Sequence, residues 1–149
     1  MKTKKILLTA LVIIWMAVIF GFSSQNGQSS GGFSERLILS AAKLIGFDSV
    51  PSAALDVLQT VVRKGAHFSS YAVLALLSFP AVASYGAKKN LRYTISLGIC
   101  FLYAISDELH QAFIPGRNGN PIDVLIDTAG AAFGLLIIMI FFKLTKKTR

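Results

Sequence analysis

The chain has 149 residues, of which 54% are hydrophobic and only 15% are charged. Soluble domains carry about 25% charged residues, so this composition excludes a soluble globular domain and indicates a membrane protein. The net charge of +8 does not indicate nucleic-acid binding, because the basic residues lie at the ends of apolar segments rather than on one clustered face. The single cysteine, Cys100, excludes an intramolecular disulfide.

The first predicted element is a transmembrane helix over residues 6–22, which follows three lysines. A cleaved signal peptide is the competing interpretation. The apolar segment is long for a signal, and no small-residue cleavage pattern closes it, so a retained helix is favoured.

A long loop follows, and its two halves differ. Residues 23–32 are rich in Ser, Gly and Gln and are expected to be flexible. Residues 33–46 place Phe33, Leu37 and Leu44 on one stripe of a helix, with Glu35 and Lys43 opposite. This pattern predicts an interfacial amphipathic helix that lies in the headgroup layer.

Three further transmembrane helices are predicted, over residues 67–85, 91–111 and 122–142. Pro80 lies inside the second span, where membrane helices tolerate a local kink. The predicted fold is therefore all-α: residues 1–149 form a single domain, a bundle of four transmembrane helices with the amphipathic helix in the long outer loop.

The distribution of lysine and arginine predicts the orientation. With both termini in the cytoplasm, ten of the fifteen basic residues lie on the cytoplasmic side, as the positive-inside rule requires. They are in the two tails and the short loop between the second and third spans: Lys2, Lys4, Lys5, Lys88, Lys89, Arg92, Lys143, Lys146, Lys147 and Arg149. A multi-pass protein of a bacterial cell membrane is expected.

The uncharged stretches of the last two predicted spans are too short to cross the hydrocarbon core. Only fourteen residues separate Arg92 from Asp107, and fifteen separate Asp127 from Lys143. Fourteen residues rise about 21 Å, whereas the hydrocarbon core is about 30 Å thick. The acids at the outer ends are therefore expected to be drawn inward and to face partners inside the bundle. Arg117 is expected to form an ion pair with these buried acids.

Polar side chains of all four spans converge on the outer end, and this convergence defines the candidate site. Helical spacing aligns Asp107 with His110 and Gln111, and Asp127 with Gly130 and Gly134, two small residues suited to close helix packing. The candidate acid–base or hydrogen-bonding residues are His67, Asp107, Glu108 and His110. The candidate substrate-binding residues are Gln25, Arg63, Lys64, Gln111, Arg117, Asp123 and Asp127. Residues 120–123, Asn-Pro-x-Asp, are also typical of a helix start, with Asn120 as N-cap and Asp123 completing a capping box.

Four short segments and four single residues form a recognisable pattern: residues 22–25 (FSSQ), 63–68 (RKGAHF), 103–111 (YAISDELHQ) and 113–117 (FIPGR), with Asp123, Asp127, Thr128 and Gly130. In these residues, which cover nearly the whole chain in the family's order, the chain resembles the VanZ-like family of small membrane proteins. The family takes its name from a protein linked to low-level resistance to the glycopeptide teicoplanin. The resemblance implies a role in the cell envelope.

Two function classes follow, and the residues leave both open. One is a non-enzymatic factor that binds an anionic or lipid-linked headgroup at the outer leaflet, for which Arg and Lys are suited. The other is a membrane enzyme, or a proton-coupled transporter, that uses the His, Asp and Glu residues for proton transfer. No metal or other cofactor is expected, because the ligand types lack a tight spacing such as HExxH and nearby cations would oppose a metal ion. The expected partners are membrane lipids or a lipid-linked cell-wall precursor.

Overall fold

A computed structural model describes residues 2–147, apart from the side chains of residues 28, 29, 146 and 147. The described chain is helical and contains no strand, which confirms the predicted all-α class. Its five helices are α1 (Lys2–Ser23), α2 (Gly27–Leu44), α3 (Ser52–Ser84), α4 (Lys89–Gln111) and α5 (Pro121–Lys147).

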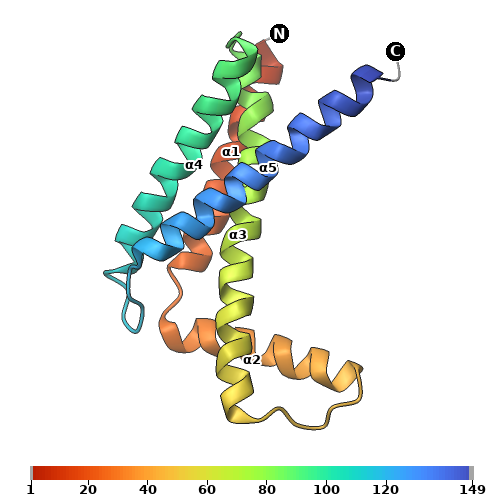
Figure 1. The fold of residues 1–149 in the computed structure, drawn as a ribbon. Helices are drawn as coiled ribbons and strands as arrows, with labels where there is room; N and C mark the ends of the chain where they lie inside the picture. The colour runs from red at the N-terminus through yellow and green to blue at the C-terminus, as the bar shows by residue number, and fades with distance from the viewer. Residues whose placement is uncertain (1, 148–149) are drawn as a thin grey trace.

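α1, α3, α4 and α5 form a bundle, and α2 lies across one end of it (Figure 1). α1, α3 and α4 run side by side, and α5 crosses them diagonally, with its most extensive contacts on α3. α2 runs roughly across α3, beyond the ends of α1, α4 and α5 (Figure 1). α1 begins and α5 ends at the opposite end of the bundle from α2.

Three of these helices, α1, α3 and α5, are long and apolar enough to cross a membrane. Their large hydrophobic residues are extensively exposed on the outside of the bundle, for example Ile13, Phe133 and Ile140, as lipid-facing residues are. α4 packs in the same bundle but does not reach the same apolarity, since polar residues such as Arg92 and Asp107 lie toward its two ends. A membrane architecture with three spanning helices is therefore supported, and the crossing of the membrane by α4 stays a prediction.

α2 is longer than the sequence pattern predicted. It includes the expected amphipathic segment but begins at Gly27, so part of the stretch expected to be flexible is helical. The reason is a tertiary contact: the Gly27 amide donates a hydrogen bond to the Pro115 carbonyl (3.2 Å). A Cβ atom at Gly27 would lie only 2.1 Å from the Gly116 carbonyl oxygen. Only glycine allows this approach, which anchors the start of α2 on the α4–α5 loop.

α3 also begins earlier than the predicted second span. It starts at Ser52, directly after Pro51, and continues without interruption to Ser84. Its 33 residues extend about 50 Å at about 1.5 Å per residue, which exceeds the thickness of the hydrocarbon core. The first turns of α3 therefore project past the ends of the neighbouring helices and contact α2.

The glycine stripe of α5 brings this helix into backbone contact with α3. A Cβ atom at Gly130 would lie 2.1 Å from the Phe68 carbonyl oxygen, and one at Gly134 would lie 2.4 Å from that of Ala72. Both distances are too short for a methyl group, so the glycines permit a separation that no larger residue allows.

We expect Gly130→Ala and Gly134→Ala each to lower the free energy of unfolding by about 1–3 kcal/mol, because the added methyl group forces the two helices apart. Gly130→Leu and Gly134→Leu should lower the free energy of unfolding further. Leu136→Ala is the control, since this side chain is 43% exposed and should matter less. Unfolding in detergent measures the effect; glycine variants as stable as the parent chain would contradict the packing argument.

Candidate functional site

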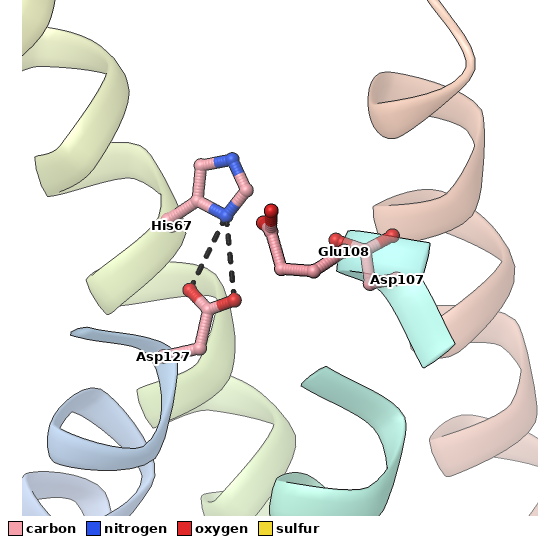
Figure 2. A group of neighbouring side chains, drawn as sticks. All are labelled: His67, Asp107, Glu108 and Asp127. Carbon is pink, nitrogen blue, oxygen red and sulfur yellow. Dashed lines mark hydrogen bonds and ion pairs between the residues drawn. The ribbon is translucent and has the colours of Figure 1, made fainter. Parts of the chain in front are cut away.

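Three helices bring four ionisable side chains together inside the bundle (Figure 2). His67 comes from α3, Asp107 and Glu108 from α4, and Asp127 from α5. One nitrogen or oxygen atom from each lies within 4.8 Å of the corresponding atoms of the other three. The carboxylates are almost completely buried, with Asp107 2%, Glu108 5% and Asp127 0% exposed. We call these residues the four-residue cluster.

The glycine contact between α3 and α5 explains why His67 and Asp127 meet. Gly130 lies about one turn after Asp127 and packs on the backbone of Phe68, which follows His67 directly. The close approach therefore places the two side chains opposite each other. His67 Nδ1 lies 3.2 Å from Asp127 Oδ1 and 3.5 Å from Oδ2 (Figure 2).

The two carboxylates of α4 are held by neutral hydrogen-bond donors. Asp107 Oδ2 accepts from Ser23 Oγ (2.9 Å) and from Gln111 Nε2 (3.2 Å). Glu108 Oε1 accepts from the same Gln111 nitrogen (3.3 Å), and Oε2 accepts from the backbone amide of Asn120 (2.8 Å). The second oxygen of Asp107, Oδ1, is buried and has no hydrogen-bond partner among the residues that the structure describes.

The α4–α5 loop closes tightly over α4. A Cβ atom at Gly119 would lie 2.4 Å from the Glu108 carbonyl oxygen, so the loop backbone lies directly against the helix. Asn120 Oδ1 accepts from the Ile122 amide (3.0 Å) and caps α5, as predicted. The predicted capping box is incomplete, because Asp123 pairs with Lys64 instead (3.1 Å).

Arg117 does not form the predicted ion pair with a buried acid. Its Nη1 donates to Gln111 Oε1 (3.0 Å) and its Nη2 to the Phe22 carbonyl (3.3 Å). Gln111 thus separates the guanidinium from the carboxylates, with its amide nitrogen toward the acids and its oxygen toward the cation. Burial lowers the pKa of the Arg117 guanidinium, and the charge of Arg63 lowers it further.

His110 lies outside the four-residue cluster. Its ring stacks on Phe20 at a centroid distance of 4.4 Å, and its Nε2 lies 3.2 Å from Ser24 Oγ. It therefore faces the end of α1 rather than the other candidate residues. Lys64 and Asp123 likewise form a separate, partly exposed pair.

A pocket of about 260 Å³ opens beside the cluster, between α1, α2 and α3. Most of its lining is apolar, including Val18, Phe33 and Leu37. The polar side chains that line it include three candidate site residues from different elements: Gln25, Arg63 and Arg117. His67 lines the pocket as well, so the pocket adjoins the four-residue cluster.

Two residues beside the candidate set also belong to the site. Ser23 bonds directly to Asp107. Tyr71 is fully buried, lines the pocket and interacts electrostatically with Asp107 and Asp127. Within the described part of the chain, its hydroxyl group has no hydrogen-bond partner. The position of Tyr71 four residues after His67, on the same helical face, is the sequence signal that could have identified it.

Comparisons with known proteins give one family assignment. The family model for VanZ/LLP1 matches residues 8–142, which is nearly the whole chain and includes every candidate site residue. Neither the comparison with curated proteins nor that with solved structures gave a match.

Proposed function

The chain belongs to the VanZ/LLP1 family, and we propose that it is an envelope membrane protein that binds the anionic headgroup of an amphiphilic lipid or lipid-linked molecule. The binding site is the pocket between α1, α2 and α3, on the outer side of a bacterial cell membrane with both termini in the cytoplasm. Binding of a lipid-linked cell-wall precursor in this pocket would alter the access of glycopeptides such as teicoplanin to that precursor.

The observation that carries the proposal is the pair of arginines, Arg63 and Arg117, in a pocket whose lining is mostly apolar. Arg63 has no hydrogen-bond or ion-pair partner among the described residues, and Arg117 donates only to neutral groups. The two guanidinium groups are close enough for one to affect the pKa of the other. Two cations that share a pocket repel each other unless an anion lies between them, and arginine binds phosphate and carboxylate through paired hydrogen bonds.

The apolar part of the lining fits the rest of an amphiphile. The side chains of Val18, Phe22 and Phe33 line the pocket, and Leu37 extends this surface along α2. Binding sites of small ligands combine such an apolar wall with a few polar groups that fix orientation. A free inorganic anion would make no favourable contact with these apolar side chains, so an acyl or isoprenoid chain attached to the anion is favoured.

Catalysis on the same bound molecule is the alternative proposal. His67 lines the pocket and contacts Asp127 at 3.2 Å, an arrangement in which a carboxylate orients an imidazole for proton transfer. An enzyme would use this pair on the headgroup that Arg63 and Arg117 hold.

Native mass spectrometry of the purified chain tests headgroup binding. We expect anionic lipids to remain bound to the parent chain, and Arg63→Ala and Arg117→Ala each to lower their apparent affinity at least about tenfold, the loss of one charge-assisted contact. Arg36→Ala is the matched control, because Arg36 is exposed and does not line the pocket. Equal lipid retention by all four proteins would refute the proposed site, and conversion of the bound lipid during incubation would favour the enzyme.

A further inference from the structure

The four-residue cluster has an unbalanced charge. Its three carboxylates are buried together with one imidazole. Among the described residues, the ion pairs are Lys64–Asp123 and His67–Asp127, so no lysine or arginine pairs with a carboxylate of the cluster. If the acids are ionised, three negative charges face at most one positive charge in a desolvated place, which is costly.

The hydrogen bonds leave a carboxylate oxygen of the cluster available as a ligand atom. Ser23 and Gln111 both bind Asp107 Oδ2, whereas Oδ1 is buried without a partner. In Figure 2 one oxygen of Asp107 points toward the other cluster residues and one points toward α1. Since Ser23 is the last residue of α1, the oxygen that faces the cluster is the unpartnered Oδ1.

These neutral donors resemble the outer shell of a metal centre. In metal sites, a second layer of hydrogen bonds orients each ligand and leaves the coordinating atom free. Asp107 fits this description, because Ser23 orients it through Oδ2. Glu108 is oriented in the same way by the backbone amide of Asn120 at Oε2, while its Oε1 accepts from Gln111. The Tyr71 hydroxyl beside them is also buried and unpartnered, so it can bond to a water molecule on a bound ion.

We propose that His67, Asp107, Glu108 and Asp127 bind one divalent transition-metal ion, with zinc and manganese as the expected occupants. One imidazole and three carboxylates are ligands that both ions accept. A divalent ion balances the charge of the cluster and satisfies Asp107 Oδ1. Ligands about 2.1 Å from a tetrahedral ion lie about 3.4 Å apart, so the atoms now within 4.8 Å contract around it.

This proposal reverses the expectation of no metal. That expectation depended on the absence of a tight ligand spacing and on three nearby cations. The fold removes the first reason, because residues from three helices supply the ligands. It weakens the second for two of the three cations, because Lys64 is paired with Asp123 and Arg117 donates to Gln111. The proposal does not depend on headgroup binding.

Metal titration of the purified full chain is the test. After removal of metal with a chelator, zinc alone and manganese alone are added, with metal content and melting temperature as readouts. We expect saturable binding of about one ion per chain that raises the melting temperature. Asp127→Asn and Glu108→Gln should lower the affinity at least about tenfold.

Asp48→Asn is the control, because this carboxylate is exposed in the α2–α3 loop and outside the cluster; the metal affinity of this variant should equal that of the parent chain. Absence of saturable binding of both ions by the parent chain, or equal binding by parent and cluster variants, would overturn the proposal. Should Asp127→Asn fail to fold, Glu108→Gln and the parent chain still decide the question. Arg63→Ala is expected to impair headgroup binding but to retain the metal affinity of the parent chain. Each proposal can therefore be refuted without the other.

Discussion

Replacing His67 with alanine is expected to lower the free energy of unfolding by about 3–5 kcal/mol, the cost of leaving a buried carboxylate without its partner. Asp127 is fully buried and its one hydrogen-bond partner among the described residues is His67 Nδ1. The variant therefore leaves the carboxylate beside two other acids without its donor. Unfolding of the purified chain in detergent measures the loss.

A double-mutant cycle shows whether this loss comes from the pair. Asp127→Ala together with His67→Ala should cost less than the sum of the two single changes, because the double variant no longer buries an unpaired group. A loss of less than about 1 kcal/mol for His67→Ala, typical of exposed ion pairs, would contradict the interpretation that the pair is desolvated.

If the parent chain confers tolerance to teicoplanin on a sensitive bacterium, as proposed, Asp107→Asn is expected to abolish that tolerance while the amount of inserted protein stays normal. Asparagine keeps an oxygen that can accept from Ser23 and Gln111, the two donors to Asp107 Oδ2. It removes the negative charge and the free oxygen that face the cluster. Function should therefore be lost without loss of the fold.

Drug susceptibility and membrane-inserted protein, measured in the same cells, separate the two effects. Asp48→Asn is the control, because this aspartate is exposed in the α2–α3 loop and its substitution should change neither quantity. If tolerance and inserted protein fall together for Asp107→Asn, the cluster has only a structural role.

Several features of this molecule could be read from the sequence because they depend on local spacing. The short uncharged stretches of residues 93–106 and 128–142 predicted buried acids, and Asp107 and Asp127 are indeed buried. The four-residue spacing of Gly130 and Gly134 predicted a close helix contact, which both glycines make with α3.

The position of His110 could not be read in the same way. Successive helical residues turn by about 100°, so Asp107 and Glu108 point in clearly different directions, and the cluster lies between them. Gln111 projects about midway between the two and bonds to both acids, whereas His110 points about 110° away from that direction, toward Phe20. The i, i+3 spacing that aligns His110 with Asp107 does not take the direction of Glu108 into account.

Contacts between distant segments account for the other differences. The start of α2 at Gly27 depends on the Pro115–Gly116 backbone, and the partner of Arg117 depends on where Gln111 lies between it and the acids. Neither contact leaves a periodic pattern in the sequence, so propensity and spacing did not reveal them.

The central claim is that the pocket and the cluster lie at the outer face of a four-crossing bundle, and site-directed cysteine labelling tests it most directly. Single cysteines replace Asp48, Asn90 and Asn118, which are all exposed and lie in the α2–α3 loop, at the start of α4 and in the α4–α5 loop. Buried Cys100 is first replaced with alanine. A membrane-impermeant reagent added to intact cells should label positions 48 and 118 and leave position 90 unlabelled. Labelling of position 90 alone would place the site on the cytoplasmic side, and identical behaviour of positions 90 and 118 would show that α4 does not cross the membrane.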